Sequence, residues 1–379
     1  MSATLDKRVI EIFRNGQAPF RGQENDVHNF VRDFYENVIT TNKDFEQSAC
    51  CISGDTRMAE IQKKLPEILL QHNYGCGTTI PGDDLRELTV ADWGCGSGVD
   101  CYTLSYLVGE NGKVIGIDMS EEQLGRARSF QDEIMASFHY QEPNVFLNKD
   151  YIELGKSIPD NSVDLVVSNC VINLSPDKKS VFQAIFDKLK EGGEVYISDI
   201  VLDRRFPMEL YENPQGFARL LGECVGGALY IQDLNDTMIA AGFTDPRVVK
   251  INRIRDEVQG VSIGVYSAEI RAFKISQHEK SPVTAHLNPM DTACEDYGQI
   301  AVYNGTNPVS PSQFVLDDEH CFAAHKPTAV CRNTARMLRD TRLARYFEVT
   351  GPVRHFGAFD CSSDAPPESS KEESGGCCC

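Results

Sequence analysis

The chain has 379 residues and a formal net charge of −19 at pH 7, with 37 basic and 56 acidic side chains. This length allows a large core and more than one domain, and the acidic excess would repel a phosphate backbone, so we expect no nucleic-acid partner. No apolar run reaches the roughly 18 residues of a membrane span, and the N-terminus lacks the apolar core of a signal peptide. We therefore expect a cytoplasmic protein with no membrane partner. In that compartment the 14 cysteines are more typical of metal or redox chemistry than of a disulfide framework.

Residues 1–80 are predicted to form a helical cover. Apolar side chains recur at helical spacing from Asp26 to Thr40, which is typical of an amphipathic helix. Its aromatic stripe suits core packing, or alternatively a lid over a bound ligand. A second helix is expected from Thr56 to His72, with an irregularity at Pro66 because proline lacks a backbone N–H.

The segment around a glycine-rich loop predicts a nucleoside-binding site. A short apolar strand ends in Asp92, and the loop that follows precedes a helix and a second strand that closes on Asp118. Glycines let the backbone approach a ligand closely, and the N–H groups of the next helix face the same point. An acid at the end of the second strand suits the hydroxyls of a ribose. The residues predicted to contact the ligand here are Asp92, Gly94, Cys95, Gly96, Ser97, Gly98, Asp118 and Met119.

The loop departs from the dinucleotide pattern. Its glycines read G-x-G-x-G rather than G-x-G-x-x-G, which favours a nucleoside-plus-amino-acid ligand. The pattern resembles that of the Rossmann-like S-adenosylmethionine methyltransferases, in which the loop cradles the methionine part. A structural turn in some other α/β domain is the alternative.

The rest of residues 81–278 predicts an α/β fold with a doubly wound, mostly parallel sheet, because strands alternate with helices. Residues 203–236 are expected to be an insertion after the fifth strand. The other expected elements are a helix opened by a capping box at Ser120 and running through Phe138, strands Asn144–Tyr151, Val163–Ser168 and Glu194–Ile200, a helix Asp177–Lys190 stopped by Gly192–Gly193, and antiparallel edge strands Arg247–Ile251 and Tyr266–Ile275.

Two strand ends add candidate ligand contacts. Asp150 and Tyr151 end the third strand beside the expected adenine position, and Asn169 ends the fourth. Asp150 suits a hydrogen bond to an exocyclic amine, but ordinary turn chemistry explains it equally well.

Five cysteines are predicted to gather at the same edge. Ligands of an open parallel sheet lie beyond the carboxyl ends of its strands, where Cys170 follows the fourth strand and Cys224 lies in the insertion. Cys50, Cys51 and Cys76 precede the first strand, within the cover, and their small neighbours should leave the thiols accessible.

The spacing of the cysteines bears on their ligand. Cys95 and Cys101 lie within the loop and its helix and fit the role of small buried hydrophobes. A structural zinc takes four ligands, usually from C-x-x-C pairs, and none occurs in this chain. A soft trivalent metalloid takes three thiolates around an open pocket, which the dispersed cysteines favour.

From about residue 279 the chain changes character, and we expect a smaller C-terminal α+β domain over residues 279–361. Val302, Phe314 and Leu316 suggest strands, and Ala329–Phe347 a basic-faced helix. Residues 362–379 are polar and acidic and end in three cysteines. Such a segment cannot bury a core, so we expect a disordered tail.

Three cysteine motifs resemble those of the arsenite methyltransferases. They are Tyr74–Gly77, Ser168–Leu174 and Gly222–Tyr230, and the resemblance extends from the Cys50 segment to the cysteine-ended tail. It implies that Cys170 and Cys224 bind As(III), and that Cys50 and Cys76 take part in binding or in a thiol–disulfide relay. Cys51 is a near-duplicate whose role stays open, and the C-terminal domain receives no role.

The resemblance and the topology together predict an enzyme that moves methyl groups from S-adenosylmethionine to arsenite, and then to methylarsenite, presented as thiol conjugates. Paired thiols such as Cys50 or Cys51 with Cys76 would return the oxidised arsenic to the trivalent state, and thioredoxin or glutathione would reduce the disulfide. We expect a monomer that serves arsenic detoxification. The alternatives are a methyltransferase of organic small molecules with a structural thiol or zinc site, and a metalloid-buffering protein.

Overall fold

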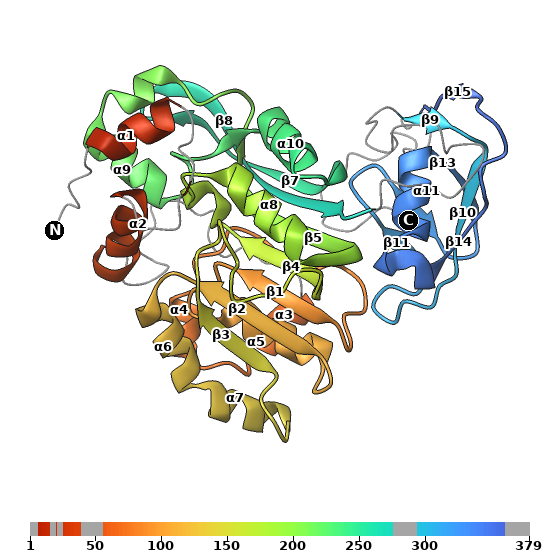
Figure 1. Ribbon diagram of the computed structural model, residues 1–379, viewed down its shortest axis with the longest axis horizontal. Helices are drawn as coiled ribbons and strands as arrows, with labels where there is room; N and C mark the ends of the chain where they lie inside the picture. The colour runs from red at the N-terminus through yellow and green to blue at the C-terminus, as the bar shows by residue number, and fades with distance from the viewer. Residues whose placement is uncertain (1–6, 16–19, 21–25, 39–55, 276–293, 361–379) are drawn as a thin grey trace.

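The computed structural model describes residues 7–15, 20, 26–38, 56–275 and 294–360 (Figure 1). A twisted sheet with strand order β3-β2-β1-β4-β5-β8-β7 forms its centre, and the short β6 pairs with β5. The first five strands of this order are parallel, and β8 and β7 are antiparallel to their neighbours. The strands are β1 Thr89–Trp93, β2 Lys113–Asp118, β3 Val145–Lys149, β4 Val163–Asn169, β5 Leu189–Leu202, β6 Leu229–Tyr230, β7 Thr244–Val258 and β8 Val261–Phe273. The predicted Rossmann-like, mostly parallel α/β fold is confirmed.

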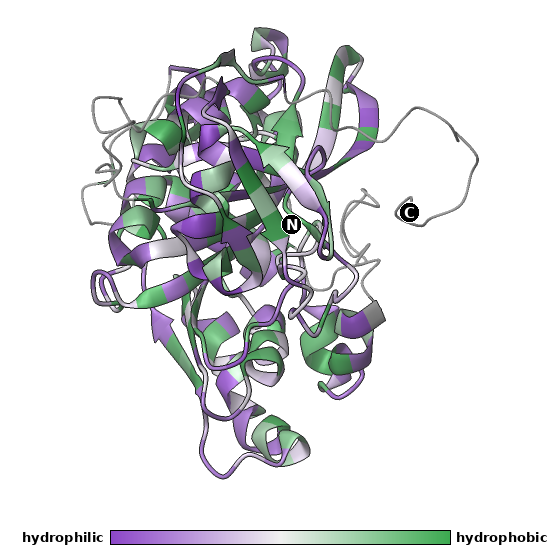
Figure 2. Cartoon of the chain, turned by 90° about the vertical axis from the view of Figure 1, so that its right-hand side faces the viewer, coloured by the Kyte–Doolittle hydropathy of each residue, from purple (hydrophilic) through white to green (hydrophobic). Residues whose placement is uncertain are grey.

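Helices cover both faces of this sheet. One apolar core lies between the sheet and α3 to α7, and a second lies between the opposite face and α8 and α10. Strands covered on both faces are apolar almost throughout, as the buried run of β4 shows. In Figure 2 the helices carry both hydrophobic and hydrophilic residues, as elements with one covered face do. The helices are α3 Thr56–Gln62, α4 Glu67–Gln71, α5 Val99–Val108, α6 Glu121–Ser129, α7 Gln131–Phe138, α8 Lys178–Lys188 and α10 Ile231–Ala240.

A third core gathers the N-terminal helices over the carboxyl edge of the sheet. Helices α1 (Lys7–Arg14), α2 (Asp26–Asn37) and α9 (Pro214–Gly222) pack there against the far end of the β7–β8 hairpin. Three cysteines, Cys76, Cys170 and Cys224, belong to this same core. The cover and the insertion therefore meet over the strand ends.

Three predicted elements were wrong in their bounds. The expected glycine stop at Gly192–Gly193 lies inside β5, and α8 ends earlier, at Lys188. The helix after Ser120 is divided at Phe130 into α6 and α7. The helix over Ala329–Phe347 shrinks to α11 (Arg332–Arg339) followed by the 3-10 turn Arg342–Tyr346.

The C-terminal residues 294–360 form small sheets and α11 around a core of their own, to the right of the central sheet in Figure 1. The predicted domain boundary near residue 279 lies outside the described residues. Buried charges join this part to the sheet: Arg342 pairs with Asp83 and Glu194, and Arg271 pairs with Glu194 at 2.7 Å. The strands are β9 Glu295–Asp296, β10 Gln299–Tyr303, β11 Gln313–Val315, β12 Cys321–Ala323, β13 Pro327–Val330, β14 Phe347–Val349 and β15 Gly357–Ala358.

Across the part of the chain that the structure describes, no helix has the length and apolar character needed to cross a bilayer.

Candidate functional site

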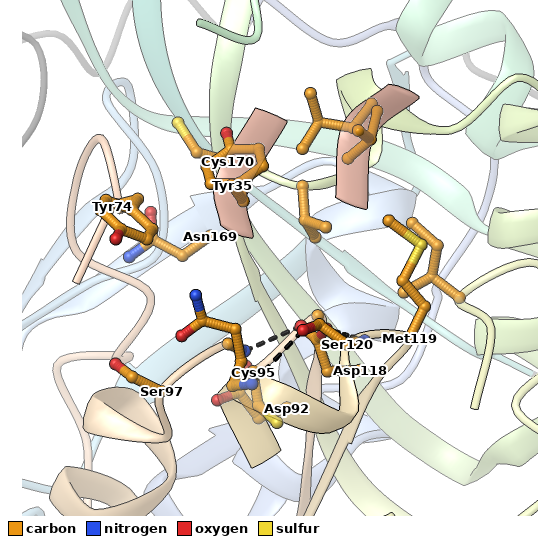
Figure 3. Close-up of a pocket in the computed structure, with 18 of the residues that line it drawn as sticks. Tyr35, Tyr74, Asp92, Cys95, Ser97, Asp118, Met119, Ser120, Asn169 and Cys170 are labelled. Atoms are coloured by element: carbon orange, nitrogen blue, oxygen red, sulfur yellow. Dashed lines mark hydrogen bonds between the residues drawn. The ribbon is translucent and has the colours of Figure 1, made fainter. Parts of the chain in front are cut away.

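A pocket opens at the carboxyl ends of β1, β2 and β4, with an empty volume of about 1040 Å³ that includes some open solvent. Helix α2 and the loop before β1 close it from the other side. In Figure 3 Asp118 and Cys170 lie on opposite sides of this space. The glycine loop lines the side of Asp118, and the side of Cys170 is called the sulfur side. The predicted residues that line it are Asp92, Gly94, Cys95, Gly96, Ser97, Asp118, Met119, Tyr151, Asn169 and Cys170. Four other predicted site residues within the described part of the chain do not line it: Cys76, Gly98, Asp150 and Cys224.

Glycine is required where the loop turns under the pocket. Gly94 has φ +80°, and a Cβ there would lie 2.5 Å from Val171 Cγ2. Gly96 has φ +49°, and a Cβ there would meet no atom within 4 Å. The first glycine thus allows close packing, and the second leaves backbone open toward a ligand.

Asp118 ties the loop to the second strand. Its carboxylate accepts hydrogen bonds from the N–H groups of Gly96 at 2.9 Å and Ser120 at 2.8 Å. Burial raises the pKa of Asp118, although these backbone donors oppose the shift. Ser120 itself caps α6 by accepting from Gln123 N. This confirms one half of the predicted capping box; in the other half Asp118, and not Gln123, accepts from the Ser120 N–H.

Two further buried acids, Asp92 and Asp100, line the pocket. Burial raises the pKa of Asp92 well above its usual value, with a contribution from the charge of Asp100. Burial likewise raises the pKa of Asp100. A cationic ligand would relieve both shifts by pairing with the ionised acids. Asp100 was missed in the sequence, although an acid in the first turn of the loop helix was a usable signal.

Asn169 connects the cofactor loop to the cysteine side. Its amide donates to Asp100 Oδ2 at 3.0 Å and its carbonyl oxygen accepts from Cys76 N at 3.0 Å. A Cβ on Gly75 would lie 2.3 Å from the Asn169 Nδ2, so glycine is needed for the loop to approach this closely. The residue predicted as a cofactor contact therefore also positions Cys76.

Cys76 and Cys170 form a disulfide across 94 residues of sequence. Both are buried, at 5% and 8% exposure. The expectation that Cys76 is an accessible thiol was wrong, because Asn169 and the neighbouring strand enclose it. The expected pairing of Cys76 with Cys50 or Cys51 is replaced here by pairing with Cys170; Cys50 and Cys51 lie outside the described residues.

Cys224 lies beside this disulfide, as the topology predicts. Its Sγ donates to the backbone oxygen of Cys170 at 2.8 Å. Both cysteines adopt the left-handed region, with φ 53° for Cys170 and φ 63° for Cys224. Such a conformation is costly for a residue with a Cβ and clusters at functional sites. The backbone is thus bent at both positions in a way that brings Cys224 Sγ against the Cys170 backbone.

Two buried charges support the turn after Cys170. Asp199 accepts from the N–H groups of Ile172 at 3.1 Å and Asn173 at 3.3 Å, and burial raises its pKa to about 7. One of its oxygens lies within 4.8 Å of the sulfurs of Cys76 and Cys170. Lys178, whose pKa burial lowers to about 8, donates to backbone oxygens of the same turn. Neither residue was predicted.

Cys95 and Cys101 are buried, which confirms their predicted role as small core residues. Although a hydrogen bond with Cys101 lowers the pKa of Cys95, burial and nearby acids raise it to about 11. Burial raises the pKa of Cys101 well above its usual value. Both remain protonated thiols at neutral pH, unlike a metal-binding thiolate.

Asp150 has the turn role that the sequence left open. Its oxygens accept from Tyr151 N at 2.8 Å and from Ser157 N at 2.7 Å. Tyr151 does line the pocket, where its ring lies 5.3 Å from that of His28. Glu153 and His28 are further lining residues that form a buried pair at 3.2 Å. Their positions are set by packing of distant elements, which gave no sequence signal.

Helix α2 packs in the core with one set of side chains and lines the pocket with another. Its Val27, Phe30 and Phe34 are buried, as the packing interpretation predicts. Tyr35 lines the pocket and donates to Gly222 O at 2.9 Å, two residues before Cys224. The same helix therefore packs in the core and spans the pocket from the glycine loop to the cysteine side.

Comparisons with known proteins point to one family. Residues 84–242 match the family described as "Methyltransferase domain". The chain is 40% identical to an arsenite methyltransferase of Aquipseudomonas alcaligenes, covering 90% of this chain and 96% of that protein. It is 35% identical to an arsenite methyltransferase of Homo sapiens, covering 84% and 82%. The crystal structure of an arsenic (III) S-adenosylmethionine methyltransferase from Chlamydomonas reinhardtii superimposes with a TM-score of 0.73 at 36% identity, covering 80% of this chain and 99% of that one.

Proposed function

Because the chain belongs to the arsenite methyltransferase family, we propose that it transfers methyl groups from S-adenosylmethionine to trivalent arsenic held by the thiolates of Cys170 and Cys224. The observation that carries the proposal is that Cys170 lines the same pocket as the glycine loop, with Cys76 bonded to its sulfur and Cys224 against its backbone. Arsenite, and then methylarsenite, would enter as thiol conjugates and exchange onto these sulfurs.

The cofactor side of the pocket fits S-adenosylmethionine, which supplies an electrophilic methyl group on a cationic sulfonium. Asp118 would accept hydrogen bonds from the ribose hydroxyls. Asp92 and Asp100 would face the positive charges of the methionine part, since both are buried and burial raises the pKa of each carboxyl, a shift that a cationic ligand would oppose. The open backbone at Gly96 leaves room for the ligand.

The thiolates would bind arsenic as a soft metalloid and keep it electron-rich. Arsenite has three exchangeable positions and would take Cys170, Cys224 and one further thiol, Cys76 or Cys50. Methylarsenite has two and would take Cys170 and Cys224 alone. The protein contributes orientation more than acid–base chemistry, because the arsenic lone pair itself attacks the methyl group.

Methylation oxidises arsenic from the trivalent to the pentavalent state, and the disulfide accounts for its return. Two thiolate sulfurs on arsenic would leave as the Cys76–Cys170 disulfide, and the two electrons they release would restore trivalent arsenic. Thioredoxin or glutathione would then reduce that disulfide by thiol exchange. Such a cycle fits a monomer in the cytoplasm that serves arsenic detoxification, because that compartment keeps thiols reduced.

A methyl-transfer assay tests the proposal. The reduced protein is incubated with methyl-labelled S-adenosylmethionine and either arsenite or a panel of small organic nucleophiles. We expect label in methylated arsenic, and none in the organic compounds. Label in an organic acceptor, with none in arsenic, would favour the organic-substrate alternative.

A further inference from the structure

A second pair of cysteines lies in the C-terminal part, away from the pocket. Cys331 precedes α11, is fully buried, and accepts from Thr334 N at 3.4 Å. Cys294 is half-buried just before β9 and forms a side-chain hydrogen bond to Cys331. The two sulfurs are therefore close together, and one of them is reachable from solvent.

This pair lies beside the edge strand β7, away from the glycine loop. Arg247 of β7 donates a hydrogen bond of 3.3 Å to Thr334 Oγ1, and this oxygen lies 3.3 Å from Cys331 Sγ. In the sheet Arg247 pairs with Arg271, which pairs with Tyr196 in the middle of β5. The strand order β4-β5-β8-β7 places two strands between β7 and β4, the strand that Cys170 follows, so these strands separate the two groups of sulfur atoms.

The surroundings of Cys331 favour its thiolate form. The hydrogen bond from Cys294, that from Thr334 and the charge of Arg247 lower the pKa of Cys331 to about 4, although burial opposes them. Ion pairs with Asp245 at 2.6 Å and Asp317 at 3.3 Å hold the Arg247 side chain, which is 10% exposed. A fixed, buried cation beside a thiolate and a second thiol is the setting of a reactive thiol pair rather than of inert core cysteines.

We propose that Cys294 and Cys331 form a second metalloid site, which binds monomethyl trivalent arsenic outside the transfer pocket. The choice of ligand rests on the proposed function, which supplies methylarsenite as a product. Two thiols suit an arsenic atom that carries one methyl group and has two exchangeable positions.

The number of ligands excludes the nearest competitors. Among the described residues, the cysteine, histidine and acid side chains group in threes only at Cys76, Cys170 and Asp199, so no third ligand atom joins Cys294 and Cys331. Structural zinc takes four ligands, and arsenite takes three thiolates. The pair is therefore matched to a ligand with two open positions.

Binding balances without any redox partner. The thiol proton of Cys294 and one proton from solvent convert the two hydroxyls of methylarsenite into two leaving waters, while the Cys331 thiolate bonds to arsenic with no proton to lose. Two As–S bonds form, two As–O bonds break, and arsenic remains trivalent throughout.

Protection from alkylation tests the site in the full-length, reduced enzyme. We expect methylarsenite to slow the reaction of Cys294 with iodoacetamide, followed by peptide mass spectrometry, by about tenfold or more, because a thiolate bound to arsenic is no longer a nucleophile. The peptide of Cys321, an exposed cysteine of the same part, is the matched control and should react at an unchanged rate. Equal alkylation of Cys294 with and without methylarsenite would overturn the proposal.

Variants separate this site from the transfer pocket. Cys331→Ser should remove the protection of Cys294, whereas Cys170→Ser with Cys224→Ser should leave it intact, so failure of the proposed function and of this site give different results. Because Cys331 is buried and its replacement can disturb folding, the half-buried Cys294→Ser is the second variant. Native mass spectrometry should show one bound methylarsenite fewer than in the wild type. Protection that persists in a folded Cys331→Ser variant, or an unchanged count in Cys294→Ser, would refute the site.

Discussion

The two sides of the pocket bend the backbone in the same way with different residues. On the cofactor side the left-handed conformations belong to Gly94, Gly96 and Gly98, which adopt them at no steric cost. On the sulfur side they belong to Cys170 and Cys224, which carry a Cβ. Each such residue costs on the order of 1 kcal/mol or more, so the sulfur side keeps strained backbone where the cofactor side avoids it.

The difference separates close approach of the backbone from binding by a side chain. A loop that has to let a ligand come close to its backbone does without side chains, so glycine serves it. A site that holds a soft atom needs sulfur at the turn itself, and it accepts the strain because glycine has no thiol. We therefore expect changes on the sulfur side to abolish chemistry, and changes on the cofactor side to weaken binding by a finite factor.

The largest expected effect is at the two strained cysteines. Cys170→Ser and Cys224→Ser should each reduce transfer to arsenite and to methylarsenite to background, because a serine hydroxyl stays protonated and is a hard donor. Product is measured by separation of arsenic species, under reducing conditions. S-Adenosylmethionine affinity should remain near wild type, and Cys321→Ser serves as the matched control with normal turnover. If both pocket variants were as active as Cys321→Ser, arsenic would not be bound at this site.

Replacement of Cys76 should affect methylation of the two arsenic substrates differently. Cys76→Ser is expected to lose arsenite methylation, because arsenite takes a third thiol and its product is reduced at the cost of a thiol pair. Transfer to methylarsenite should persist, since two thiolates suffice to hold it. Cys50→Ser should behave in the same way if Cys50 binds arsenic in the first methylation. The double variant with Cys50→Ser and Cys51→Ser tests this in a protein where Cys51 cannot take the place of Cys50. Equal losses on both substrates would mean that Cys76 holds arsenic in every round.

A smaller effect is expected on the cofactor side, at Asp118. Asp118→Ala should weaken S-adenosylmethionine binding by about 1.5–3 kcal/mol, or roughly ten- to a hundredfold, through loss of charged hydrogen bonds to the ribose. Calorimetry measures the affinity, and arsenite binding should be unaffected. Asp118→Asn is the companion variant, because it keeps one oxygen acceptor toward the loop. Unchanged cofactor affinity in both variants would show that this acid does not contact the cofactor.

The smallest effect is expected outside both sides of the pocket. Truncation after Asp360 removes the acidic tail and its terminal cysteines and should leave turnover close to wild type, because such a polar segment cannot build a packed site. Initial rates with arsenite measure this, with thermal unfolding as a control for the fold. A large loss of turnover in a protein that unfolds normally would give the tail a catalytic role.

The cofactor side of the pocket could be predicted from the sequence more completely than the sulfur side. The loop, Asp118 and the Ser120 cap were predictable, because glycine spacing and capping are local patterns. The local pattern at Gly192–Gly193 gave a wrong prediction. It is typical of a helix end, but both glycines lie within β5, where strand pairing decides the structure. The pairing of Cys76 with Cys170 and the support from Asp199 had no local signal, since they arise from contacts between segments that are far apart in the chain.

We expect Cys76 and Cys170 to supply the electrons for each arsenite turnover at this pocket. In a single-turnover experiment, fully reduced enzyme receives one equivalent each of arsenite and S-adenosylmethionine, and non-reducing peptide mapping follows. Monomethylated arsenic should form together with a disulfide-linked peptide that joins Cys76 to Cys170, and no such peptide should form when S-adenosylmethionine is omitted. Trivalent methylated arsenic formed while both cysteines remain reduced would show that the electrons come from elsewhere.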